Sequence, residues 1–115
     1  QLLPAAAEAD VGVMNGWSIL RGMLTGVDLE KTVSNTGRWK NDPDLEPSIK
    51  IWRWCDNEGV DILQLALQFC LREERVHGNN IGSLNKQQLL DNVTSASTPL
   101  PAGVLERFDQ FRQTL

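Results

Sequence analysis

The spacing of apolar residues predicts several helices. Helical spacing predicts one helix over 2–9, a second that begins around Pro47, and a third that begins after Asp61. Pro47 suits the first turn of a helix, and Gly59 suits the left-handed residue that ends one. Asp61 is a favourable N-cap, and Gln64 three residues later completes a capping-box signature.

The helix that begins after Asp61 is almost entirely apolar. Its apolar residues are Ile62, Leu63, Leu65, Ala66, Leu67, Phe69, Cys70 and Leu71. Only Gln64, Gln68 and Arg72 interrupt them as a thin polar stripe. We therefore expect neighbouring elements to enclose this helix on most of its circumference.

Two segments are predicted strands. The run 11–14 is continuously apolar rather than alternating, which is typical of a parallel strand covered on both faces. The run 76–81 has poor strand propensity, but it lies between two predicted helices where a strand is needed. Asn85 with Gln88 then predicts a capped helix, and a last helix is expected from Pro101 through Phe111.

Residues 25–44 are polar and rich in turn-forming residues, so they predict a long surface loop. Loops of this length in compact domains tend to be functional or mobile. Trp39 lies within it and either anchors the loop to the body or forms part of a ligand-binding wall. The anchor is the favoured interpretation, because aromatic side chains usually supply packing area.

Composition narrows the class of protein. The 115 residues are 41% hydrophobic and 23% charged, which is typical of one modest globular domain. The net charge of −4 offers no basic field for a nucleic acid. No apolar run approaches the roughly 20 residues that span a bilayer, so we expect a cytoplasmic chain with no membrane partner. Cys55 and Cys70 lack metal-ligand spacing, and buried reduced thiols are expected.

Both predicted strands run into turns that contain glycine, and the second turn leads directly into the helix capped by Asn85. A glycine lets the backbone approach a ligand closely, and a helix N-terminus favours an anion. Tight connections also need glycines when no ligand binds, and for the isolated chain this purely structural role is slightly favoured.

In this order the elements resemble the C-terminal portion of an aldo-keto reductase. The resemblance covers nearly the whole chain and rests on Asn15, 22–26, 65–69, 82–83, Asn92 and 99–102. It is closest to the dehydrogenases of L-fucose, L-galactose and D-threo-aldoses. The family fold is a (β/α)₈ TIM barrel, so residues 1–115 would form a single segment, an α/β partial barrel with the last two βα units and the C-terminal helix.

The resemblance also implies a site for NAD or NADP. Its implied residues are Asn15, Gly16 and Trp17 facing the nicotinamide, Ile19, Arg21 and Gly22 along the pyrophosphate, and Gly82, Ser83, Gln88, Asp91 and Asn92 around the adenine ribose. Many relatives carry Lys or Arg at the positions of Leu84, Asn85 or Gln88, where these bases hold the 2′-phosphate of NADP. Their absence favours NAD, with Lys86 as a partial substitute.

The chain lacks the proton-transfer groups of that family, in which a Tyr acts with Lys, Asp and His from earlier strands. It contains no Tyr, and its single His77 is expected to be a hydrogen-bonded structural residue. Glu73 and Glu74 lie beside arginines and predict a solvated charge cluster. We therefore expect no catalytic residue or metal site, no turnover, and weak or absent cofactor binding by this chain alone.

Two hypotheses about function remain open at this stage. The chain is either the C-terminal part of an NAD(P)-dependent sugar or aldehyde oxidoreductase, or a non-catalytic interaction module derived from a barrel fragment. The first residue, Gln1 rather than Met, fits a piece of something longer. Two strands would leave open sheet edges, so either hypothesis predicts self-association or contact with the missing barrel segments.

Overall fold

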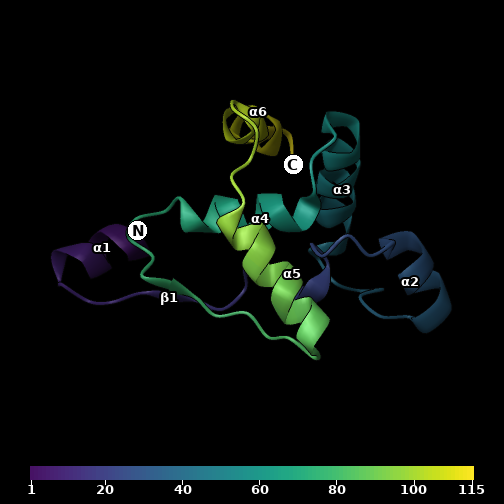
Figure 1. The fold of residues 1–115 in the computed structure, drawn as a ribbon, viewed down its shortest axis with the longest axis horizontal. Coiled ribbons are helices and arrows are strands. Elements are labelled where there is room, and N and C mark those ends of the chain that lie inside the picture. The colour runs from purple at the N-terminus through teal and green to yellow at the C-terminus, as the bar shows by residue number, and fades with distance from the viewer.

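The computed structural model describes residues 1–115 and is mostly helical, with one small parallel sheet (Figure 1). The elements in chain order are α1 (Leu2–Glu8), β1 (Met14–Asn15), η1 (Leu20–Gly22), α2 (Leu29–Thr36), α3 (Leu45–Glu58), α4 (Ile62–Leu71), β2 (Gly78–Asn79), α5 (Lys86–Ser97), α6 (Val104–Phe111) and η2 (Arg112–Thr114). The order of predicted helices and strands is confirmed, and one further helix, α2, is present.

Local signals set the helix ends between α3 and α4. Gly59 ends α3 in the left-handed conformation (φ 66°), and the backbone N–H of Gln64 donates to Asp61 Oδ1 at 2.7 Å. The predicted second half of the capping box is wrong. Gln64 Nε2 instead donates to the carbonyl oxygens of Thr98 and Pro99, at 2.9 and 3.0 Å. The side chain therefore links α4 to the connection between α5 and α6.

The core surrounds α4, which lies across the middle of the molecule with α3, α5 and α6 around it (Figure 1). Its buried cluster consists of Leu24, Cys55, Ile62, Leu65, Ala66, Val104 and Phe108. Enclosure of α4 is confirmed for its first two turns, whereas Leu71 at its end is exposed. Arg72 at the same end pairs with Asp109 of α6 through two hydrogen bonds of 2.6 and 2.7 Å.

Strands β1 and β2 pair in parallel, with Met14 opposite Gly78 and Asn15 opposite Asn79. The predicted strands over 11–14 and 76–81 are therefore confirmed in position but are much shorter than expected. The prediction that the first strand is covered on both faces is wrong, because Val11 is 55% exposed and Met14 is 68% exposed. The physical reason is that β1 has one neighbouring strand and no layer of side chains over this part of it.

The predicted loop over 25–44 is also wrong, because it contains α2. The backbone N–H of Lys31 donates to Asp28 Oδ1 at 2.9 Å, and Gly37 ends the helix with a φ of 68°. Leu29 is the one buried residue of α2. The polar composition of the segment concealed a short helix that its two end signals specify.

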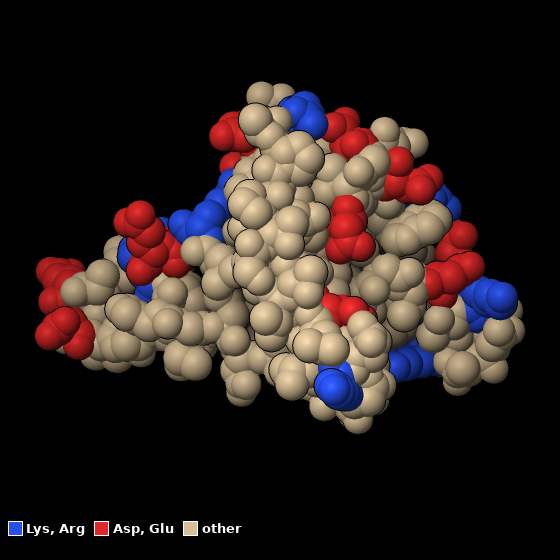
Figure 2. Space-filling model, in the orientation of Figure 1, with Lys and Arg blue, Asp and Glu red and all other residues tan.

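Much apolar surface is left uncovered. The accessible surface is 7680 Å², against about 6,300 Å² expected for a monomer of this mass. On and before α5, Leu84 is 93% exposed, and Leu89, Leu90 and Val93 are also exposed. Figure 2 shows a broad area without charged side chains over the middle of the molecule, where Figure 1 places α5.

None of the helices combines the length and hydrophobicity that crossing a membrane requires.

Candidate functional site

A cavity of about 830 Å³ lies between the two glycine turns. One wall comes from residues 16–27 together with Arg38 and Trp39, and the other comes from residues 80–92, while α4 contributes Leu63. The volume falls within the range of roughly 300–1,000 Å³ that is typical of small-molecule and cofactor sites. The cavity therefore joins two segments that lie roughly sixty residues apart in the chain.

The cavity contains every predicted cofactor-binding residue except Asn15. The predicted residues that line it are Gly16, Trp17, Ile19, Arg21, Gly22, Gly82, Ser83, Gln88, Asp91 and Asn92. Their grouping was predicted from the resemblance, and the structure brings them to one place.

Asn15 joins the two strand ends instead of lining the cavity. Its Nδ2 donates to Asn79 Oδ1 at 2.9 Å and to Ser18 Oγ at 3.0 Å. Its Oδ1 accepts from the backbone N–H of Trp17 at 3.1 Å. Ser18 is buried and donates in turn to Asn79 Oδ1 at 2.9 Å. The amide of Asn15 thus fixes where the first turn begins.

The first turn carries an unusual backbone. Leu20, Arg21 and Gly22 have consecutive positive φ values of 43°, 55° and 93°. Glycine adopts this region freely, whereas the two other residues need support from their surroundings. Part of that support comes from Thr25, whose Oγ1 donates to the carbonyl oxygen of Gly22 at 2.8 Å.

Carboxylates neutralise the Arg21 side chain. Its Nη2 forms an ion pair with Asp42 and lies 3.4 Å from Asp44 Oδ2. Its guanidinium carbon also lies 4.6 Å from the centre of the Trp17 ring. Arg21 therefore joins the turn to the segment before α3 and shares its charge with two acids.

The second turn is fixed by side chains at the start of α5. The backbone N–H of Gln88 donates to Asn85 Oδ1 at 2.9 Å, as the cap signature predicts, and that of Leu84 donates to Gln88 Oε1 at 2.8 Å. Asn92 Nδ2 donates to Ser83 Oγ at 3.0 Å. The first turn of α5 contains no acidic residue, so the positive end of its dipole faces this region unopposed.

Sequence reasoning missed Arg38. Trp39 is half-buried, its ring lies over Gly22, and it also lines the cavity, so its position is compatible with both of the roles considered for it. The guanidinium carbon of Arg38 lies 4.1 Å from the centre of the Trp39 ring. Its Nη2 donates to the carbonyl oxygen of Arg21 at 3.0 Å. The N-cap residue Asp28 and the helix-ending Gly37 could have indicated α2, the helix after which the chain returns to the first turn.

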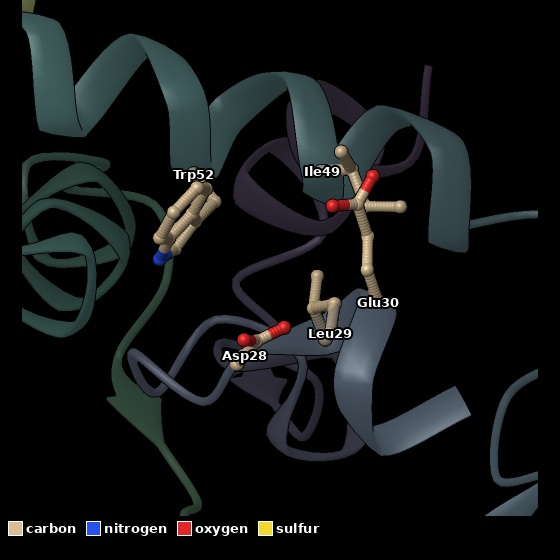
Figure 3. A pocket seen from close by; sticks show the side chains of 5 residues that line it. All are labelled: Asp28, Leu29, Glu30, Ile49 and Trp52. Atoms are coloured by element: carbon tan, nitrogen blue, oxygen red, sulfur yellow. The ribbon is translucent and has the colours of Figure 1, made fainter. Parts of the chain in front are cut away.

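A second hollow, between the start of α2 and the side of α3, has a volume of about 70 Å³ (Figure 3). The residues that line it are Asp28, Leu29, Glu30, Ile49 and Trp52. Glu30 pairs there with Arg53 of α3 at 2.8 Å. The hollow has less than a tenth of the volume of the larger cavity, so the larger cavity is the candidate site.

The perturbed titratable groups lie outside the cavity. A side-chain hydrogen bond from Arg75 lowers the pKa of Glu73 to about 2, in keeping with the predicted charge cluster. Burial raises the pKa of the Cys55 thiol to about 12, so this thiol is protonated at neutral pH. His77 Nδ1 accepts from the backbone N–H of Val13 at 3.1 Å, which is the predicted structural role.

Comparison with known proteins identifies one family. The model of the aldo/keto reductase family matches residues 1–113, a range that includes both turns and all the cavity-lining residues. A search of curated proteins found no match for the chain.

Proposed function

Because the chain belongs to the aldo/keto reductase family, we propose that it supplies one wall of an NAD(P) site to an oxidoreductase of this family. The observation that carries the proposal is the single cavity that collects the predicted residues of both turns. In the parent enzyme, β1 and β2 would be the last two strands of a barrel. The branch of aldose dehydrogenases is the proposed substrate class, on the resemblance at Asn15 and the C-terminal tail.

Each part of the cavity suits a part of a dinucleotide. Trp17 offers an exposed ring beside Gly16, where a nicotinamide can stack. The N-terminus of α5 and the glycine turn before it present backbone N–H groups, which suit phosphate oxygens. When bound, NAD would accept the hydride that the oxidised aldose gives up, and the residues of this chain would bind and orient the dinucleotide.

NAD fits this wall better than NADP. No Lys or Arg stands at Leu84, Asn85 or Gln88 to hold a 2′-phosphate. Asp91 lines the cavity from α5, and a carboxylate accepts hydrogen bonds from ribose hydroxyls while it repels a phosphate. Lys86 is the one basic residue in the first turn of α5.

The proposal assigns no proton transfer to this chain. It has no Tyr, and the ring nitrogen Nδ1 of its single His accepts a backbone hydrogen bond. Ser18 and Ser83 hydrogen-bond to asparagine side chains and have no adjacent base. The acid, and the groups that tune it, would come from other segments of the parent enzyme.

A titration followed by NMR tests the proposed site. With NAD, we expect fast-exchange shifts at Trp17, Arg21, Gly82 and Ser83, and a millimolar dissociation constant because the opposing wall is missing. NADP should bind more weakly. Shifts confined to the hollow between α2 and α3, or no shifts at tens of millimolar NAD, would contradict the proposal.

A second candidate function, an interaction module, is favoured by the exposed apolar side chains of α5. Leu89 and Val93 are one helical turn apart and both are about half exposed. The accessible surface of the chain is roughly a quarter larger than expected for its mass, and exposed apolar side chains form part of that surface. We propose a second copy of this chain as the occupant, in place of the missing barrel segments.

Light scattering after size-exclusion chromatography tests this association. We expect a mass above that of one chain at high concentration, and a monomer when Leu89 and Val93 are both replaced by Lys. Replacement of Lys31 and Lys50, which are exposed charged residues, is the matched control and should leave the mass unchanged. A monomer at every concentration would reject the module.

A further inference from the structure

We infer that Arg38, and not Arg21, is the residue of the cavity that binds the diphosphate of a nucleotide. The inference rests on the proposed function and goes beyond it, because the resemblance places Arg21 and not Arg38 along the pyrophosphate.

The charges around the cavity separate the two arginines. Arg21, Arg38 and Asp91 are the charged residues that line it. Arg21 already pairs with Asp42 and lies near Asp44, so an added anion would have to displace a carboxylate. Arg38 forms no ion pair with any carboxylate in the structure, and Asp91 belongs to the other wall. The uncompensated positive charge of the cavity is therefore the guanidinium of Arg38.

The guanidinium of Arg38 is held ready for an anion. Its carbon lies over the Trp39 ring, 4.1 Å from the ring centre, and its Nη2 donates to the carbonyl oxygen of Arg21. A guanidinium has five N–H donors, so most of them have no protein acceptor. A stacked guanidinium loses less conformational freedom on binding than a free one, and its fork matches two phosphate oxygens.

Arg38 also lies directly over the glycine turn. A methyl group added at Gly22 would lie 3.8 Å from Arg38 Nη2 and 3.8 Å from Trp39 Cζ2. The resemblance places this turn along the pyrophosphate, and Arg38 reaches it from the segment after α2. The guanidinium and the turn are therefore adjacent at the cavity wall, where a diphosphate could contact both.

The test compares ADP with adenosine, which share the base and ribose and differ in the diphosphate. For the full chain followed by NMR, we expect Arg38→Gln to weaken ADP binding about tenfold and adenosine binding less than about twofold. Arg38→Lys should recover part of the ADP affinity, because it keeps the charge and loses the fork. Arg107→Gln, which lies on α6 outside the cavity and pairs with Glu58, is the matched control and should change neither affinity.

The outcomes distinguish the inference from the proposed function. Unchanged ADP binding in Arg38→Gln, while the wild type binds both ADP and NAD, would overturn the assignment of Arg38 and leave the proposed function standing. Equal losses of ADP and adenosine would show that Arg38 only shapes the cavity, and would also overturn it. No binding of NAD or ADP by the wild type would overturn the proposed function and the assignment together.

Discussion

Replacing Phe108 with Ala is expected to lower the free energy of unfolding by about 3–5 kcal/mol. Phe108 is 7% exposed, and its ring centre lies 5.3 Å from that of Trp54 and 5.5 Å from that of Phe69. It thereby holds α6 against both α3 and α4. Since small domains are stable by only about 5–15 kcal/mol, a loss of this size removes a large share of the stability.

Urea denaturation followed by tryptophan fluorescence measures the effect, because Trp54 lies beside the substituted ring. Leu2→Ala is the matched control, since Leu2 is 75% exposed and its loss should change stability by less than about 0.5 kcal/mol. A midpoint for Phe108→Ala that equals the wild-type midpoint would show that α6 does not belong to the cooperative core.

The parts of the fold that were predictable depend on short-range chemistry. Asp61 and Asn85 cap helices with their own side chains, and Gly59 ends one because it adopts a positive φ without strain. The same chemistry operates at Asp28 and Gly37, but the helix between them buries only one residue. The helix is only eight residues long and mostly polar, so the two apolar residues on one of its faces, Leu29 and Val33, did not stand out from the turn-forming residues around them.

The extent of the strands was not predictable, because it depends on neighbours that a sequence pattern assumes. The continuous apolar run 11–14 is typical of a strand covered on both faces, yet the structure has one partner strand and leaves Val11 exposed. The apolar run indicates that the segment is suited to a strand with side chains packed on both faces. Because Val11 is exposed, this chain does not supply that packing.

The candidate site was predictable where its residues follow directly from the strand ends. Gly22 and Gly82 lie in turns that parallel strands bring to the same edge, so their meeting follows from topology. Arg38 and Trp39 reach the cavity only because α2 turns the chain back, which is a tertiary effect. Asn15 lies at the strand end where it was predicted to face the nicotinamide, but its side-chain amide donates to Asn79 at the end of the other strand.

Replacing Gly82 with Val should weaken NAD binding by about tenfold or more, without a comparable loss of stability. Gly82 lines the cavity, and a methyl group added there would meet no atom within 4 Å. Its φ lies outside the left-handed region, so the fold does not need glycine at this position. A branched side chain would therefore fill only space that the adenosine end of NAD needs.

Gly12→Val provides the matched control for this experiment. A methyl group at Gly12 also meets nothing within 4 Å, and Gly12 does not line the cavity. We expect both variants to unfold at nearly the wild-type urea concentration, and only Gly82→Val to lose the NMR shifts that NAD causes. If both variants bind NAD as the wild type does, the second turn needs its glycine for neither the fold nor the ligand, and the dinucleotide lies elsewhere. If Gly82→Val unfolds, the fold itself needs glycine at this turn, and the assignment of its open space to the adenosine end of NAD loses its structural basis.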